Sequence, residues 1–158
     1  DKLGFTPVSN NRLKFLVQQF VPKLDGDYKI LVYGNKYCVV YRQNRLKDFR
    51  ASGSGRLLFP SHVPFDILDF ARAMFEGFDV PYASIDIGYD GKECYMFEFQ
   101  FVMFGQYAIQ RSPHHFSMIN GKWQRKDGVL SAEQELVKAV HSYIQKGIEN
   151  GTKKNLLD

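Results

Sequence analysis

The chain has 158 residues, of which 44% are hydrophobic and 15% aromatic, so it can bury one sizeable core. No apolar run approaches the ~20 residues that span a bilayer, and no charged-then-apolar leader opens the sequence, which argues against a membrane protein. The net charge of +4 suits an anionic partner and does not choose among nucleotide, nucleic acid and lipid. Cys38 and Cys94 each lie within an apolar, β-rich run, which favours a reducing, cytoplasmic location.

The first elements along the chain form a predicted hairpin. Residues 15–21 are apolar and β-prone, and residues 22–26 end this run with turn-forming residue types. Residues 27–33 and 36–42 then have the pattern of two strands. They are joined by a Gly-Asn pair, which is typical of a two-residue hairpin turn.

The length of this turn determines which side chains face one another. Two turn residues set Asp27 opposite Arg42 and put Lys29 on the same face. Residues 43–60 follow as a loop with a Ser-Gly-Ser-Gly run at 52–55, whose backbone amides suit phosphate oxygens. The cations that crowd this stretch are Arg42, Arg45, Lys47, Arg50 and Arg56. A purely solvated loop has the same composition, so the pattern alone does not assign a phosphate site.

Two helices are predicted from the spacing of apolar residues. The first covers residues 64–78, with Pro64 at its start and Gly77 near its end. Ser131 and Gln134 make a capping box that opens the last helix. The predicted apolar face of that helix consists of Leu136, Val137, Val140, Tyr143 and Ile144.

A second hairpin is predicted between the helices, from residues 83–88 and 93–101 with a turn around an Asp-Gly pair. Residues 106–128 are irregular or hold short strands. His114 and His115 are candidates for a substrate contact, but we interpret them as a surface loop pair, because no carboxylate or cysteine lies at metal-ligand spacing beside them. The order of strands, helix, strand hairpin and helix predicts an α+β fold, an antiparallel sheet with flanking helices.

The segment Cys-Tyr-Met-Phe-Glu-Phe-Gln-Phe at residues 94–101 is the most informative part of the sequence. Side chains alternate along a strand, so one face is wholly aromatic and is expected to be buried: Tyr95, Phe97, Phe99 and Phe101. Glu98 and Gln100 share the other face with Cys94 and Met96. A carboxylate in a core strand needs compensation, and Glu98 with Gln100 offers oxygen ligands suited to Mg²⁺. Pairing of Glu98 with a buried Arg or Lys, without a metal, is the alternative.

Asp86 is the third candidate ligand, and the register of the second hairpin decides whether it lies near Glu98. A two-residue Asp-Gly turn would set Asp86 opposite Tyr95, on the aromatic face. A three-residue loop or one β-bulge would set Asp86 opposite Met96 and diagonal to Glu98. A carboxylate among four aromatic rings is unfavourable, so we predict the odd-length connection.

Taken in order, the segments between residues 15 and 101 resemble the second half of the ATP-grasp fold, closest to its glutamate-ligase-like branch. Val-Gln-Gln-Phe-Val-Pro at 17–22 resembles the segment between the two lobes, whose backbone holds adenine, with Gln19 where that family often has Glu. Asp27 and Lys29 resemble the Asp-x-Arg pair of the family, with Lys replacing Arg. Arg42 matches the arginine that closes the following strand.

The other correspondences lie in the loop and in the second hairpin. Asp-Phe-Arg-Ala-Ser at 48–52 resembles an Asp-Phe-Arg-x-Asn stretch, with a serine in the Asn position. Asp86, Glu98 and Gln100 match the Asp…Glu-x-Asn magnesium ligands, with Gln for Asn. Gln100 is longer than Asn and can shift a second metal site, and Lys29 gives up bidentate geometry.

The resemblance implies a ligase that uses ATP and one or two Mg²⁺ ions to activate a carboxylate as an acyl phosphate, which an amine then attacks. It implies nucleotide contacts from Gln19, Phe20, Val21 and Asp27, metal ligation by Asp86, Glu98 and Gln100, and catalytic roles for Arg42, Lys29 and Arg50. The implied partners are a small carboxylate and an amine, together with the earlier half of the fold in the same polypeptide. That half carries the glycine-rich loop and a lysine on the nucleotide, so we expect no ATP turnover from this chain alone.

The expected organisation is a partial ATP-grasp lobe over residues 1–105, an extension with the last helix over 106–150, and a frayed tail over 151–158. Two other functions fit part of the pattern. A kinase with the same machinery acting on a hydroxyl would use the same catalytic residues. A nucleic-acid-binding module is suggested by the basic loop and the aromatics, but these aromatics follow core patterns rather than alternating with Lys and Arg. The substituted residues also suit an inactive relative.

Overall fold

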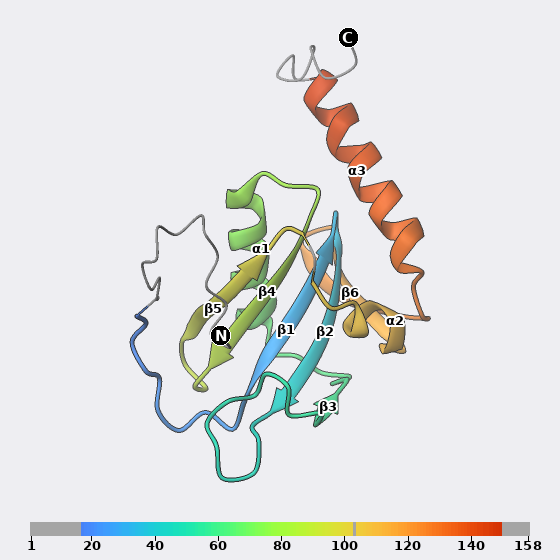
Figure 1. Cartoon of the computed structure of the whole chain (residues 1–158). Helices are drawn as coiled ribbons and strands as arrows, with labels where there is room; N and C mark the ends of the chain where they lie inside the picture. The colour runs from blue at the N-terminus through green and yellow to red at the C-terminus, as the bar shows by residue number, and fades with distance from the viewer. Residues whose placement is uncertain (1–16, 103, 150–158) are drawn as a thin grey trace, which may run out of the picture.

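The computed structural model describes residues 17–102 and 104–149, and it is a mixed α+β fold whose antiparallel sheet carries helices on both faces (Figure 1). The predicted fold class is therefore confirmed. The strands are β1 (Gly26–Tyr33), β2 (Lys36–Gln43), β3 (Leu57–Leu58), β4 (Tyr82–Tyr89), β5 (Cys94–Gln100), β6 (His114–Ile119) and β7 (Lys122–Asp127). The helices are α1 (Phe65–Phe78), α2 (Tyr107–Arg111) and α3 (Ala132–Glu149). Strand order is β5-β4-β1-β2-β6-β7, and β3 pairs with β2.

The β1–β2 hairpin has the predicted two-residue turn. Tyr33 pairs with Lys36, and this register continues to Asp27 opposite Arg42. Gly34 occupies the left-handed region with φ of 59°, which costs a glycine little because it lacks Cβ. The β-prone run before the hairpin does not form a strand in its described part, residues 17–21.

Helix α1 covers one face of the sheet. Its stripe of Ile67, Leu68 and Ala71 is fully buried against β-strand residues such as Ile30 and Ile85. Burying each of the large aliphatic side chains stabilises the fold by about 1.5–3 kcal/mol. This face is apolar over the central strands, so it can hold no polar site there.

The opposite face of the sheet is apolar along only half of its length. Leu31, Cys38 and Val40 pack there against α2 and α3, through residues such as Ile109 and Ala139. Toward the start of β1 the same face becomes polar. Side chains alternate along the strand, so Asp27 and Lys29 lie on the same face as Leu31. The site lies on this polar half of the face.

Helix α3 opens with the predicted cap, since the backbone amide of Gln134 donates to Ser131 Oγ at 3.3 Å. The predicted apolar face is wrong in part. Val137 is 67% exposed, whereas Ala139 and Glu135 are buried. Glu135 is tolerated there because Lys36 Nζ lies 2.6 Å and Lys138 Nζ 3.0 Å from its carboxylate.

The segment after β5 contains more regular structure than predicted. It forms α2 and then the β6–β7 hairpin, and β6 extends the sheet beside β2. His114 and His115 lie on β6 and are buried, so their interpretation as a surface loop pair is wrong. His114 Nε2 lies 2.9 Å from the carbonyl of Pro60. Within the described residues, His115 Nδ1 is buried without a hydrogen-bond partner.

We expect His115 to make the protein less stable in acid. Burial, and then the charge of Lys36, lower the pKa of His115 below its ordinary value of 6.5. The unfolded chain therefore binds a proton first as the pH falls below 6.5, and stability is lost across that window. In urea unfolding, acidification from pH 7 to about 5 should lower the midpoint less in His115→Gln than in the wild type. The control is His141→Gln, which replaces an exposed histidine on α3.

Candidate functional site

Two strand pairings bring four charged residues to one polar patch. In β1, Asp27 and Lys29 point to the same face, and Asp27 lies opposite Arg42 of β2, as predicted. On its other side β1 pairs with β4, which sets Lys29 opposite Asp86. Asp27, Lys29, Arg42 and Asp86 are therefore neighbours although they come from three strands.

These four side chains form one ion network. Arg42 donates through Nε and Nη2 to the two oxygens of Asp27, each at 2.7 Å, and Nη2 also donates to Asp86 Oδ2 at 2.6 Å. Lys29 Nζ donates to Asp86 Oδ1 at 3.1 Å and to Ser84 Oγ at 2.7 Å. The side chains of the four charged residues are between 7% and 16% exposed. Two cations thus neutralise two carboxylates that are largely shielded from hydration by water.

Burial changes the acidity of this network. Loss of hydration is the largest influence on Asp27 and raises its pKa above the ordinary 3.8, although hydrogen bonds from Arg42 oppose this. For Arg42 burial favours the neutral form, but the hydrogen bonds and charges of Asp27 and Asp86 win and raise its pKa. Arg42 is therefore a permanent cation between two carboxylates.

The register of β4 and β5 sets Asp86 directly opposite Glu98. The predicted odd-length loop is wrong, because Tyr89 pairs with Cys94 across four loop residues. The side chain of Asp90 makes this loop, since its Oδ1 accepts the backbone amides of the two residues before Cys94, each at 2.8 Å. A register shift between Asp86 and Ile87 then acts as the predicted bulge, so that Asp86 faces Glu98 rather than Phe97. The predicted partner of Asp86, Met96, instead pairs with Ile87.

The same bulge divides the predicted aromatic face of β5. Phe99 and Phe101 pack against Phe78 of α1, with ring centroids 4.8 and 5.1 Å away. Phe97 instead lies over Gly88, on the side of the polar patch. The prediction of one continuous, buried aromatic face is therefore wrong, because one extra residue reverses the side to which the following residues point.

Glu98 is exposed, and the expectation of a buried carboxylate is wrong. Its strand β5 lies at the edge of the sheet, where only one side is covered by a neighbouring strand. Among the described residues no cation or hydrogen-bond donor pairs with Glu98, unlike Asp86. Glu98 therefore faces Asp86 without a counter-charge from the part of the chain that the structure describes.

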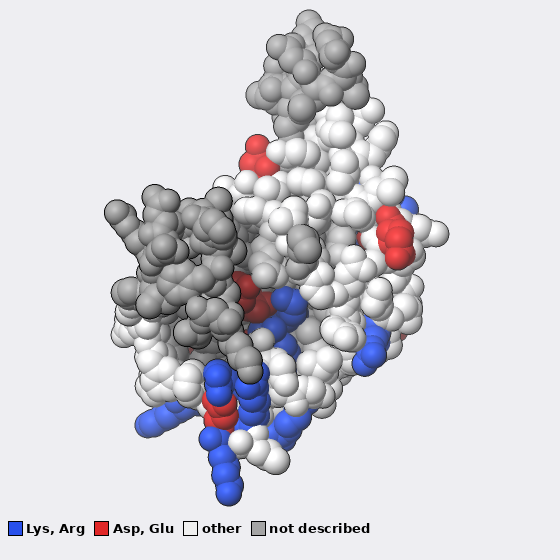
Figure 2. All heavy atoms as spheres, in the orientation of Figure 1, with Lys and Arg blue, Asp and Glu red and all other residues white. Residues whose placement is uncertain are grey.

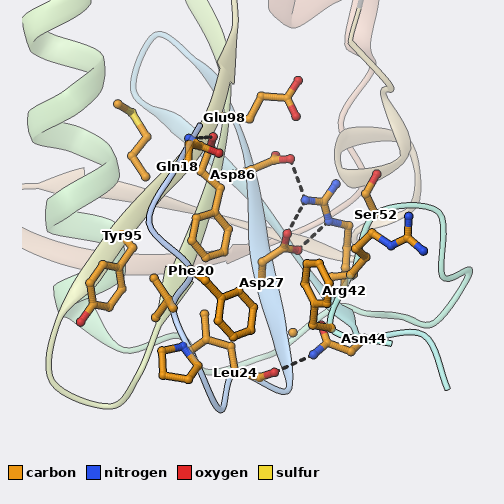
Figure 3. A pocket seen from close by; sticks show the side chains of 18 of the residues that line it. Gln18, Phe20, Leu24, Asp27, Arg42, Asn44, Ser52, Asp86, Tyr95 and Glu98 are labelled. Carbon is orange, nitrogen blue, oxygen red and sulfur yellow. Dashed lines mark hydrogen bonds and ion pairs between the residues drawn. The ribbon is translucent and has the colours of Figure 1, made fainter. Parts of the chain in front are cut away.

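Three walls enclose a cleft of about 890 Å³ over the network. The first is the sheet, with Asp27, Arg42, Asp86 and residues 95–98. The second is residues 18–24, which Gln18 ties to β5 by donating to the carbonyl of Phe97 at 2.9 Å. In Figure 3, Phe20 lies below the carboxylates and guanidinium of the network, and Tyr95 lies to their left on β5.

The third wall is the loop at residues 49–52. Phe49 closes against Phe20 in an edge-to-face contact with centroids 5.3 Å apart, and both rings are more than half exposed. Arg50 is exposed and pairs with Asp48 at 2.6 Å rather than with the network, and this pair lowers the pKa of Asp48 to about 2. Figure 2 shows charged side chains of both signs in a hollow at the middle of this face and basic ones along its lower edge.

Most of the residues that the sequence nominated meet in this one cleft. The nominated residues that line it are Gln19, Phe20, Val21, Asp27, Arg42, Arg50, Asp86 and Glu98. Lys29 does not line the cleft and contacts it through Asp86. Gln100 lies two residue pairs beyond Glu98, opposite Ser84, and is also outside the lining.

Sequence reasoning missed Ser84 and Asn44. Ser84 could have been found, because it lies two residues before Asp86 and so shares its face of β4. No pattern in the sequence predicts a role for Asn44. Its Nδ2 donates to the carbonyl of Leu24 at 2.6 Å and fastens the second wall to the end of β2.

The carboxylates of the cleft do not by themselves make a complete metal cage. Among residues 17–102 and 104–149, no three His, Cys, Asp or Glu side chains are grouped to hold a metal ion. In the same ranges, no helix has both the length and the apolar character needed to cross a membrane. Comparison with protein families, with curated proteins and with solved structures finds no match to this chain.

Proposed function

We propose that this chain is part of a cytoplasmic, ATP-grasp-like ligase that uses ATP and Mg²⁺ to join a carboxylate to an amine. The observation that carries the proposal is the convergence in one cleft. The segment at 18–22, the pair Asp27 and Arg42, the loop at 49–52 and the pair Asp86 and Glu98 are far apart in sequence and line the same cavity. Each is a part that the ATP-grasp resemblance nominates for the nucleotide, the phosphates or the metal.

The residues present fit a magnesium ion that is shared with a substrate. Asp86 and Glu98 face each other across two strands, and Mg²⁺ in phosphate-transferring sites commonly takes one or two carboxylates plus substrate phosphates. Each oxygen of Asp86 accepts one hydrogen bond and keeps lone-pair capacity for a further partner. Gln100 lies opposite Ser84 and outside the cleft lining, so it would be at most a third, more distant ligand. When bound, the ion would neutralise phosphate charge.

The cations of the network suit the transferred phosphoryl group. In the proposed reaction a substrate carboxylate oxygen attacks the γ-phosphorus, the bond to the β-phosphate oxygen breaks, and ADP leaves. The amine then attacks the acyl carbon, phosphate leaves, and the amine loses a proton to solvent. Arg42 and Lys29 supply fixed positive charge beside the phosphoryl oxygens, and Arg50 stands at the acceptor side. Such catalysis is chiefly positioning and charge neutralisation.

The second wall suits the base of the nucleotide. Residues 19–21 form no strand or helix, so their backbone groups are free of ladder hydrogen bonds and can meet the edge of a planar base. Phe20 adds an exposed ring at the cleft mouth. Both cysteines are free thiols, which agrees with the proposed cytoplasmic location.

The test is calorimetric titration of Mg²⁺ with a non-hydrolysable ATP analogue. We expect metal-dependent binding by the wild type and a loss of at least about tenfold in affinity in Glu98→Gln, because a charge-bearing ligand is replaced by a neutral amide. The matched control is Glu76→Gln, on the exposed face of α1, which among residues 17–102 and 104–149 pairs with Arg72 alone. It should bind as the wild type does.

Three outcomes would contradict the proposal. Wild-type protein that binds no analogue would oppose a nucleotide site, and equal affinity in Glu98→Gln would oppose the metal ligand. Binding that persists without Mg²⁺ would oppose the shared ion. With binding established, a screen of carboxylic acids and amines, run on a polypeptide that also contains the earlier half of the ATP-grasp fold, should give an amide product. A phosphate ester would indicate transfer to a hydroxyl instead.

A further inference from the structure

Ser84 is the buried polar residue at the end of the ion network. It is 1% exposed, lies on β4 two residues before Asp86, and faces Gln100 of β5. Its Oγ accepts a hydrogen bond from Lys29 Nζ at 2.7 Å, a shorter contact than the 3.1 Å from the same nitrogen to Asp86. The hydroxyl is thus the nearer of the two acceptors of this ammonium.

The ammonium of Lys29 has three donors at tetrahedral angles. Ser84 and Asp86 take two of them, and within the described residues no third acceptor contacts Nζ. Two hydrogen bonds to fixed strand residues stop rotation about the last bond of the side chain, so the direction of the third donor is also set. The side chain is 16% exposed, and its ammonium contacts Asp86, which lines the cleft.

We propose that Ser84 is a positioning residue: it holds the Lys29 ammonium so that its third proton is presented to a phosphoryl oxygen beside Asp86. The proposal rests on the proposed function for the identity of the ligand, and on the geometry alone for the role of the hydroxyl. Without that hydroxyl, the Lys29 ammonium keeps one acceptor among the described residues, Asp86, and can rotate about its Cε–Nζ bond. A lysine, which lacks the rigid fork of an arginine, thereby gains a defined direction from a neighbouring side chain.

The first measurement follows the ammonium itself in the full chain. A proton–nitrogen NMR signal from Lys29 Nζ should appear at low temperature in the wild type, and its loss in Lys29→Arg assigns it. The signal should disappear in Ser84→Ala and remain in Ser84→Thr, which restores the hydroxyl. The control is Ser117→Ala, a serine on β6 that is also buried but has no contact with the network. Unfolding midpoints confirm that each variant is folded.

The second measurement is the affinity for Mg²⁺ with the non-hydrolysable ATP analogue. We expect Ser84→Ala to weaken it about tenfold, with Ser84→Thr and Ser117→Ala within about threefold of the wild type. Ser84→Ala with wild-type affinity, or with an unchanged ammonium signal, would overturn the proposal. If the wild type binds no nucleotide, the proposed function fails separately. Titration with inorganic phosphate then decides for Ser84: a shift of the ammonium signal in the wild type and in Ser84→Thr supports the proposal, and no shift in either overturns it.

Discussion

Replacing Arg42 by methionine is expected to destabilise the protein by about 3–5 kcal/mol, the typical effect of removing one partner from a buried ion pair. Arg42 makes three of the four ion contacts that the two carboxylates receive in the network, two to Asp27 and one to Asp86. Methionine fills a similar length but donates nothing. Asp27 would lose both of its hydrogen bonds while 7% exposed, and Asp86 would retain only Lys29. Urea unfolding followed by circular dichroism measures the difference.

The pH dependence of this variant distinguishes a buried charge from lost packing. The pKa of Asp27 is already raised by burial, and removing Arg42 raises it further, so the folded variant gains stability as the pH falls and the carboxylate is neutralised. The gap between Arg42→Met and wild type should therefore narrow from pH 7 to about 4. Arg50→Met, which removes an exposed pair with Asp48, is the control and should leave the midpoint nearly unchanged. A loss below about 1 kcal/mol for Arg42→Met would contradict the role given to the network.

Gly26→Ala is expected to cost about 3 kcal/mol, although it adds a single methyl group. A Cβ at Gly26 would lie 2.2 Å from the carbonyl oxygen of Arg42 and 2.8 Å from the ring of Tyr41. The first of these atoms is backbone, so β1 and β2 must separate where they carry Asp27 and Arg42. We therefore expect a lower unfolding midpoint and, in the calorimetric assay, weaker nucleotide binding.

The same substitution at Gly77 should have the opposite sign. Gly77 lies in the last turns of α1, and a Cβ there would meet no atom within 4 Å. Alanine should stabilise the helix by about 0.5–1 kcal/mol because it loses less backbone entropy on folding. A neutral Gly26→Ala would show that the close approach of β1 and β2 does not restrict residue 26 to glycine. Destabilisation by Gly77→Ala would contradict the entropy argument for α1.

The elements that depend on local chemistry were predictable. The Gly-Asn turn sets the β1–β2 register from two residues, so the pairing of Asp27 with Arg42 follows without knowledge of the rest of the fold. The apolar stripe of α1 and the Ser131 cap of α3 depend on spacings of three and four residues. In each case the interactions that decide the structure lie within a few positions of one another.

The β4–β5 hairpin shows where local reasoning stops. Its Asp-Gly pair suggests a short turn, but the side chain of Asp90 accepts two backbone amides and stabilises a four-residue loop. The bulge after Asp86 then reverses the faces of β5, which sends Phe99 toward α1 and Phe97 toward the cleft. The alternation of residues along one strand does not predict where a bulge lies, because the position of a bulge depends on packing against neighbouring elements.

The sequence by itself therefore determined the α+β class, the hairpin that carries Asp27 and Arg42, and the residue types of the cleft. Tertiary structure alone decided that β4 pairs with β1, which brings Asp86 to Arg42 across 44 residues of chain and Ser84 to Lys29 across 55. It also decided that Glu98 lies exposed on an edge strand and that His115 is buried. Strand order and edge position are set by long-range burial of apolar faces, and that free energy is a property of the assembled sheet rather than of any one segment.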